Sequence, residues 1–564
     1  MPAHPELSGP WPTVERLSSA DYPSDGPPGA MLNLARAANR EDRRELRDRA
    51  LAAATNDPHL AFQVQAEEAV DAAARNDLQR ARQLADAVLE AAADAISLAR
   101  ATEALGRAEL WSGTHSGRVR GIRLMEEAIG LFRELGSREW VGWGLTWLGY
   151  AGYYLAGELA QAVDHMRRGL DLIESPHRRV TALAFLADAL CDQGDWDGAD
   201  EVLDAAYEIC PSDFAFGWDY LAWGRARVAS ARGDRVGTVR ALAEVSQSSG
   251  PWLETIGGSG FLSEAAVLLA RVGDLDGARE WLGRAQAHPI AHSDVRRAEA
   301  ELQAIYGNPE AALETLQTLP YHDGPWESRL DWRLDLLRAV ALLRAGRAEH
   351  VPGIAVAVLE HADKAGALMS VGPGESAQLA LLAPFAMRAD SPHAGRILSS
   401  AGWVLTLMGC ASLSRDLESI GVPPGKPGEL LRLVACAPAG LLAERAVDRL
   451  WPEASAEAGQ KALRNALHRL NGAVGEAIIV RDGPRLRVNS VWVDLTHFEG
   501  LAQQALRQQD LGLVNTALAL WSGDPLDGDL YADWANEYRG HLQALKAKLV
   551  QARAELLHAR PWRE

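Results

Sequence analysis

The chain has 564 residues, a formal net charge of −19, 48% hydrophobic residues and 24% charged residues. Its length predicts more than one domain, and its composition is that of ordinary globular protein. The acidic balance excludes a protein coated in cationic surface for nucleic acid or membranes, although a single domain can still carry a local basic patch.

The first segment, 1–30, is rich in proline and acidic residues and lacks the apolar stretch of a signal peptide, so we expect a disordered leader. No apolar run approaches the ~18 residues that a membrane-spanning helix needs. The four cysteines are scattered, without a CxxC pair or a metal-like spacing. These features predict a cytoplasmic protein with free thiols, no metal and no membrane partner.

The next segment, 31–395, is dominated by helix-forming residues and contains a repeated step between small residues. In Ala182–Pro211, Gly194 precedes Ala199 by five residues, and the proline closes the second helix. A glycine tolerates the tight turn, and small side chains let two antiparallel helices approach closely. This spacing matches the tetratricopeptide-repeat pattern and predicts a helical hairpin.

The same step recurs along the segment at intervals of 34 to 41 residues. The proposed turn positions are Asn76, Gly117, Gly157, Gly194, Gly233, Gly273, Gly307 and Gly346. Most intervals exceed the ~34 residues of a strict tetratricopeptide repeat, which indicates longer helices or loops. One hairpin cannot bury its own apolar face, so we expect the hairpins to stack into a curved superhelix.

Aromatic residues gather in two parts of this segment. The first group is Trp140, Trp143, Trp147, Tyr150, Tyr153 and Tyr154, and the second is Trp218, Tyr220, Trp223 and Trp252. One interpretation is a core between helices. The other is a concave pocket for a peptide, protein or small-molecule effector.

A change of texture near residue 402 predicts a second domain at 402–494. Short apolar runs at 403–409, 411–415 and 419–422 indicate small strands. Three helices are expected next: one beginning after Pro427, one over 443–454 that ends near Trp451, and one over 456–474. Asp482-Gly483 then marks a β-hairpin. Sheet, three helices and hairpin together describe a winged helix-turn-helix.

The third helix is amphipathic. Leu463, Leu467, Leu470 and Val474 form one expected buried stripe. The opposite side carries polar and cationic residues, namely Lys461, Arg464, Asn465, His468, Arg469 and Asn471. Arginine, lysine and asparagine side chains read base edges or hold phosphates when a helix enters the major groove of DNA. The alternative interpretation is an ordinary solvated helix face.

The hairpin supplies further cations, because Arg481, Arg485 and Arg487 are expected on the side opposite to its apolar residues. The expected apolar side is Ile478, Val480, Leu486 and Val488. Residues 456–490 hold six basic and three acidic side chains, a local charge of +3 inside an acidic chain. Such a patch is typical of a DNA-contacting edge.

Several separated motifs then resemble the SARP type of bacterial transcriptional activator, with its OmpR-like winged helix. They are GKPGELLRLVACAP (Gly425–Pro438), AVDRLWPEA (Ala446–Ala454), LHRLNGAVG (Leu467–Gly475) and the IIVRDGPRLRV hairpin. The runs VDLTHFEGL and ALWSGDPLDGDLYADWANEYR resemble the opening of the bacterial transcriptional activator domain, which makes 495–564 a truncated copy. The resemblance implies binding to double-stranded DNA as oligomers in the nucleoid, and contact with RNA polymerase. Asn471 departs from the arginine that is usual there.

No catalytic or cofactor motif is visible. The run from Gly421 to Lys426 lacks the spacing and the hydroxyl residue of a phosphate-binding loop. The expected fold class is therefore mainly α: a tetratricopeptide-like α-solenoid, a small α+β winged helix-turn-helix domain and short C-terminal helices. The expected function is a transcriptional regulator without cofactors, with the array as sensor or interaction platform. The alternative is a protein-interaction scaffold whose winged helix no longer binds DNA, and an enzyme is not expected.

Overall fold

The computed structural model describes residues 58–558 and the single positions 48 and 52, with gaps inside that span. The gaps are 75–76, 92–93, 113, 213, 247–255, 290–292, 320–330, 365–372, 390–402 and 416–417. The predicted leader at 1–30 lies outside the described residues. The chain forms two compact units. The first comprises the described residues of Met1–Glu299, Gln317–Trp332 and Lys364–Glu375, and the second those of Ala300–Leu316, Arg333–Asp363 and Ser376–Glu564.

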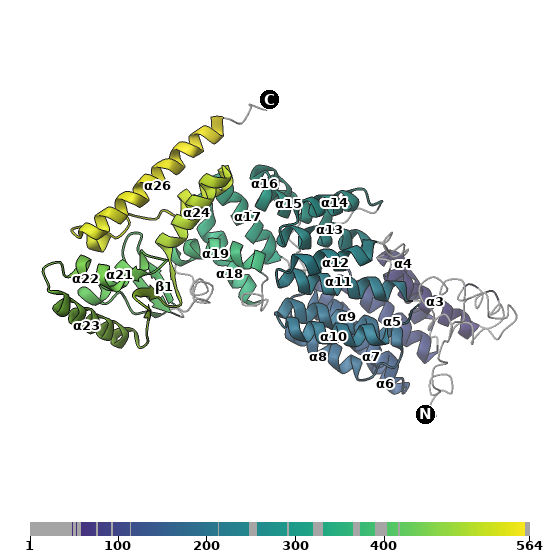
Figure 1. Ribbon diagram of the computed structural model, residues 1–564. Coiled ribbons are helices and arrows are strands. Elements are labelled where there is room, and N and C mark those ends of the chain that lie inside the picture. The colour runs from purple at the N-terminus through teal and green to yellow at the C-terminus, as the bar shows by residue number, and fades with distance from the viewer. Residues whose placement is uncertain are drawn as a thin grey trace. The chain divides into compact units, whose positions relative to one another are not determined.

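The first unit consists of paired antiparallel helices, as the sequence predicted (Figure 1). Its helices are α3 (Pro58–Ala74), α4 (Leu78–Glu90), α5 (Ala95–Leu110), α6 (His115–Glu134), α7 (Arg138–Trp147), η1 (Leu148–Tyr154), α8 (Leu159–Leu170), α9 (Pro176–Gln193), α10 (Trp196–Ile209), α11 (Ala215–Ala231), α12 (Arg235–Ser246), α13 (Ile256–Arg271) and α14 (Leu275–Gln286). The first helix of a pair also packs on the first helix of the next, as in α9 on α11 and α11 on α13. This is the stacking expected of a tetratricopeptide-like array.

Asn76 lies outside the described residues, and the other positions of the predicted ladder mark turns inside the hairpins with one error. Gly157, Gly194 and Gly233 have φ of 80°, 82° and 74°, a left-handed conformation that only glycine adopts at low cost. Gly117 instead lies inside α6, where an added Cβ would stand 1.9 Å from Oγ of Ser112. It was therefore wrongly placed at a turn, and its small size is needed for close packing.

The alanine five residues after each turn is the contact point of a hairpin. Ala162, Ala199, Ala278 and Ala312 are each 0% exposed, and so is Ala81, which is five residues after the predicted turn residue Asn76. A larger side chain at these positions would push the two helices apart. The spacing of small residues therefore correctly predicted where the two helices of each hairpin contact each other.

The second unit begins with the last hairpins of the array. These are the end of α15 (Ser293–Tyr306), α16 (Pro309–Thr318), α17 (Asp331–Ala345), η4 (Ala348–His350), α18 (Val351–Lys364) and α19 (Pro373–Arg388). The rest of the unit contains two small sheets and further helices (Figure 1). None of the described helices is long and apolar enough to cross a membrane.

The first sheet has the strand order β3-β2-β1-β7. Its strands are β1 (Trp403–Thr406), β2 (Ser412–Arg415), β3 (Glu418–Ser419) and β7 (Val491–Val493). β1 pairs antiparallel with β2 and parallel with β7, with Trp403 opposite Val491. The first three strands were predicted, although β3 is shorter than expected and begins at Glu418. The fourth strand was not predicted, and it returns the chain to the sheet after the hairpin.

Three helices and the second sheet lie between β3 and β7. The helices are α21 (Lys426–Ala435), α22 (Ala443–Leu450) and α23 (Ala456–Val474), and the strands are β4 (Leu441–Leu442), β5 (Ile479–Asp482) and β6 (Arg485–Val488) in the order β4-β6-β5. α21 contributes fully buried Leu430 and Leu431 to the core between the helices. The expected order of three helices followed by a hairpin is present.

The chain ends in three helices, α24 (Asp494–Gln508), α25 (Leu511–Leu520) and the long α26 (Asp533–His558), with the short η6 (Asp527–Asp529) before α26. They are tied to the preceding helices by side-chain contacts. Arg432 of α21 forms a bidentate ion pair with Asp529, and Trp534 donates to Glu429 over 3.3 Å. Arg449 of α22 pairs with Glu537 at 2.9 Å. These contacts hold α21 and α22 against the start of α26.

Candidate nucleic-acid interface

Helix α23 is held at both ends by local caps. The side chain of Ser455 accepts a hydrogen bond from the backbone of Ala458 at 3.3 Å, which satisfies one free N–H group of the first turn. Gly475 ends the helix with φ of 86° and donates to the carbonyl of Asn471 over 2.8 Å. The structure has α23 at Ala456–Val474, so the predicted bounds 456–474 are confirmed.

The inner side of α23 rests on α21 and α22. Leu463, Ala466 and Leu470 are 2%, 4% and 0% exposed. Gly459 faces Val447 so closely that an added Cβ would lie 2.2 Å from its Cγ1. The predicted side of α23 is therefore the buried one, but only Leu463 and Leu470 of the predicted stripe are fully buried. Leu467 and Val474 are half-buried, because they lie at the edge of the buried side.

The predicted contact residues lie on the opposite side of α23 and are exposed. They are Lys461, Arg464, Asn465, His468 and Arg469. Within the described part of the chain, none of the cations Lys461, Arg464 and Arg469 has an ion-pair partner. Asn471 differs, since it is half-buried at the boundary between the two sides. The helix thus presents a row of unneutralised cations to solvent.

The hairpin divides its three arginines between two faces. Residues directly opposite each other in an antiparallel pair share a face, and the register pairs Val480 with Arg487, Asp482 with Arg485 and Arg481 with Leu486. Arg485 and Arg487 therefore share a face with Val480, whereas Arg481 lies on the face of Leu486. The prediction that all three arginines lie on the face opposite to the apolar residues was therefore wrong. It placed Val480 and Leu486 on one face, whereas the observed register places them on different faces.

Arg485 is anchored by the turn before β4. Its Nη1 donates to the carbonyl of Gly440 over 2.7 Å. Gly440 has φ of 86°, and an added Cβ there would lie 2.8 Å from Cγ of Arg487. The glycine turn thus fixes two hairpin arginines. Arg481 instead donates to the carbonyl of Gly483 in its own turn, at 3.2 Å.

Two of the three nearby carboxylates are already paired. A hydrogen bond from Nε1 of Trp403, helped by Arg415 at 2.8 Å, lowers the pKa of Glu476. Asp482 lies 3.5 Å from Nε of Arg487. Glu457 is exposed in the first turn of α23, where the helix dipole favours an acid. The net positive charge of residues 456–490 therefore lies on the exposed sides of α23 and the hairpin.

The aromatic groups of the array belong mainly to its core. Trp140 and Tyr154 are 4% and 1% exposed, while Trp143, Trp147 and Tyr150 are partly buried against the same apolar clusters. Trp147 contacts Phe185 edge-on at 5.5 Å between ring centres. Trp252 lies outside the described residues. These contacts favour the interpretation as core over the interpretation as effector pocket.

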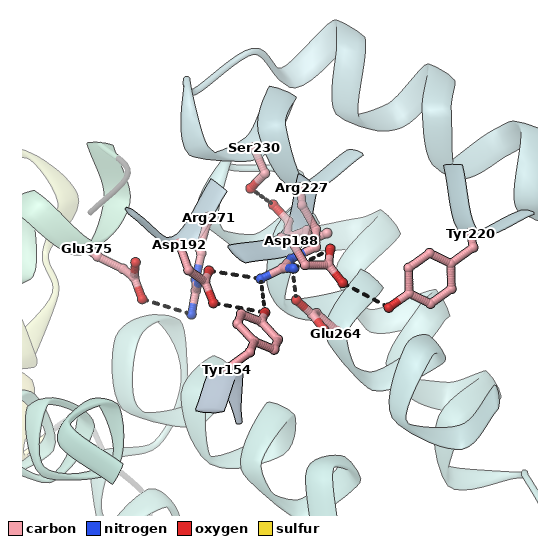
Figure 2. A network of polar contacts seen from close by, with 10 residues as sticks. Tyr154, Asp188, Asp192, Tyr220, Arg227, Ser230, Glu264, Arg271 and Glu375 are labelled. Atoms are coloured by element: carbon pink, nitrogen blue, oxygen red, sulfur yellow. Dashed lines mark hydrogen bonds and ion pairs between the residues drawn. The ribbon is translucent and has the colours of Figure 1, made fainter. Parts of the chain in front are cut away.

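A buried polar network lies beside these rings (Figure 2). Arg227 of α11 is surrounded by Asp188 at 2.5 Å, Asp192 at 2.9 Å and Glu264 at 3.1 Å, and it donates to the hydroxyl of Tyr154 over 3.2 Å. Burial raises the pKa of Asp188, although Arg227 opposes this shift. One guanidinium thus joins carboxylates from α9 and α13, and the network fixes how three successive hairpins stack.

Sequence reasoning missed this network. Asp188 and Asp192 stand four residues apart, so one helix presents both to its neighbour. The partners Arg227 and Glu264 are more than thirty residues further along the chain. Only the stacking of hairpins brings them together.

The comparisons with known proteins give distant structural likenesses only. No family model and no curated protein matches the chain. The apo form of the quorum sensor NprR from B. thuringiensis is 10% identical, with a TM-score of 0.43 over 59% of this chain and 97% of that one. NprR in complex with its cognate peptide NprX is 11% identical, with a TM-score of 0.40 over 55% and 91%. The human IFIT1 dimer with PPP-AAAA is 15% identical, with a TM-score of 0.33 over 79% and 90%.

Proposed function

We propose that the protein is a DNA-binding transcriptional regulator of the winged helix-turn-helix type. The observation that carries this proposal is the exposed side of α23. It holds Lys461, Arg464 and Arg469 without a carboxylate partner among the described residues, in a chain whose net charge is −19. Unpaired cations in one row, opposite a buried stripe, suit a phosphate backbone that carries closely spaced negative charge.

In this proposal α23 enters the major groove of a DNA duplex. Lys461, Arg464, Asn465 and His468 lie along the centre of the exposed side, where side chains reach base edges. Arg469 lies to one side and reaches the backbone. Arg485 and Arg487 of the hairpin bind phosphates of the flanking backbone, which positions the helix without reading sequence.

The remaining parts receive their roles from the same proposal. The sheet β3-β2-β1-β7, the three helices and the hairpin correspond to the SARP-like winged helix, and α24 to α26 correspond to the opening of its activator domain. The hairpin array is the sensor or interaction platform, to which a protein or small-molecule effector binds. No enzymatic activity is proposed.

The test is enrichment of genomic DNA fragments on the immobilised full chain, followed by sequencing. We expect discrete fragments with the wild type and their loss in the triple variant Lys461→Ala, Arg464→Ala, Arg469→Ala. The matched control is Arg279→Ala, since Arg279 is an exposed arginine of the array with 65% side-chain exposure. If the wild type retains no DNA but retains protein partners in stoichiometric amount, the proposal is wrong and the scaffold alternative is correct.

A further inference from the structure

Among the described C-terminal helices α24, α25 and α26, only α25 has no exposed residue. Its sequence LGLVNTALAL is apolar on nearly every side. Val514 and Ala517 are 0% exposed, and the polar Asn515 and Thr516 are 6% and 2% exposed. A helix that is hydrophobic all round must be covered on all sides. Helices α24 and α26 cover part of it, and the remaining cover comes from the array.

That cover is supplied by Arg344 at the end of α17. The side chain of Arg344 is only 9% exposed, and it lies against Gly512 so closely that an added Cβ there would stand 2.3 Å from its Nε. A glycine in the first turn of α25 is therefore needed for the two helices to meet. The end of the array and α25 share one packed interface.

Hydrogen bonds fix the register of this interface. Nη1 of Arg344 donates to the carbonyl of Ala304 over 2.9 Å, and its Nη2 donates to Asp510 over 3.2 Å. In the other direction, the side-chain amide of Asn515 donates to the backbone carbonyl of Arg344 over 2.8 Å. We name the three residues Arg344, Asp510 and Asn515 the α17–α25 clasp.

Asp510 has a second role in the clasp, because it also caps α25. Its Oδ1 accepts from the backbone N–H of Leu513 at 2.8 Å. The same carboxylate therefore both begins α25 and holds the array. An asparagine at this position would keep the cap and lose the charge that attracts Arg344, so the two roles are separable by mutation.

The contacts continue from the C-terminal end of α25 through α24 to the first sheet. Phe498 of α24 contacts Trp521, the residue after α25, at 5.2 Å between ring centres. α24 starts directly after β7, and its first residue Asp494 accepts from the backbone N–H groups of Leu407 and Met408, each at 2.9 Å. The chain of contacts therefore runs from α17 through α25 and α24 to β1 and β7, which flank the helix-turn-helix.

We propose that α25 is the coupling element between the array and α23, and that the α17–α25 clasp sets whether the two move together. The end of the array cannot shift on α25 without leaving the buried groups of Arg344 and Asn515 unpaired, which is costly. The interface therefore has discrete bound and released arrangements instead of sliding gradually. The meaning of this coupling for gene regulation depends on the proposed function, but the coupling itself does not.

The experiment is hydrogen exchange of the full chain followed by mass spectrometry, without DNA or effector. The variants are Arg344→Met and Asp510→Asn, and the control is Arg347→Ala, which removes an exposed pair with Glu310 at the same end of the array. Loss of a buried charged hydrogen bond is expected to raise exchange in α17 and α25 roughly tenfold. Exchange in α23 and the hairpin is expected to rise as well, although neither touches α17.

The control is expected to leave all of these segments unchanged. Faster exchange confined to α17 and α25, with α23 and the hairpin as in the wild type, would overturn the coupling and leave the clasp a local packing feature. Asp510→Asn keeps the helix cap, so this variant decides the question if Arg344→Met does not fold. Failure to bind DNA would count against the proposed function alone, because no DNA enters this measurement.

Discussion

Replacing Gly459 by alanine tests how α23 is seated on α22. In an exposed helix this change stabilises by about 1 kcal/mol, because glycine is the poorer helix former. In this helix an added Cβ would stand 2.2 Å from Cγ1 of Val447, which is 5% exposed and has little room to move. The two effects therefore oppose each other.

The steric effect is expected to win. Overpacking a buried contact costs about 1–3 kcal/mol, so Gly459→Ala is expected to destabilise the α22–α23 contact by up to about 2 kcal/mol after the helix propensity gain of about 1 kcal/mol. Val447→Ala alone also destabilises, since it removes buried methyl groups. In the double variant the alanine at 459 fills the space that Val447 vacates, so its cost is expected to be less than the sum of the single costs.

Hydrogen exchange of α23 is the appropriate measurement, because a chain with two compact units does not unfold in one step. Protection of α23 is expected to be highest in the wild type and lower in both single variants, and the loss in the double variant is expected to be smaller than the sum of the two single losses. Increased protection of α23 in Gly459→Ala would refute the argument, since it would mean that helix propensity decides and the close contact does not exist. Additive effects in the double variant would refute it as well.

Three further predictions concern other parts of the chain. Arg227→Met is expected to destabilise the array by about 3–5 kcal/mol, because it leaves Asp188, Asp192 and Glu264 without their shared cation. Hydrogen exchange checks this prediction, since protection is expected to fall in α9, α11 and α13. Burial lowers the pKa of His497, so the unfolded chain takes up the proton first and stability falls as the pH drops below about 6.5. The melting temperature is therefore expected to fall less in His497→Gln than in the wild type between about pH 7.5 and about pH 5.5. Gly440→Ala is expected to weaken DNA binding without unfolding α23, because its Cβ would displace Arg487, and an unchanged affinity would contradict this role.

The features that depend on neighbouring residues were predictable from the sequence. α23 has its cap at Ser455, its glycine stop at Gly475 and a regular apolar stripe, so its bounds follow from local rules. The hairpin turns of the array follow from the spacing of glycine and alanine for the same reason. The prediction of a turn at Gly117 was wrong because the sequence alone does not distinguish a glycine required for close packing inside a helix from a glycine at a turn.

The features that depend on distant pairing were not predictable. β7 has three residues and exists because β1, far earlier in the chain, offers a free edge beside it. The faces of the hairpin arginines depend on the register between β5 and β6, which places Val480 opposite Arg487 and Arg481 opposite Leu486. The partners of Arg227 and of Arg344 come from other helices, so neither contact can be predicted from the sequence of a single segment.

The salt dependence of DNA binding by the full chain tests the central claim most directly. The logarithm of the affinity falls with the logarithm of salt concentration by about 0.9 for each phosphate neutralised. Of these cations only Arg469 is assigned to the backbone, so the triple variant of Lys461, Arg464 and Arg469 is expected to reduce the steepness of this dependence by about 0.9, whereas Arg279→Ala leaves it as in the wild type. An equal slope in the triple variant and the wild type would contradict the assignment of α23 as the DNA-contacting helix.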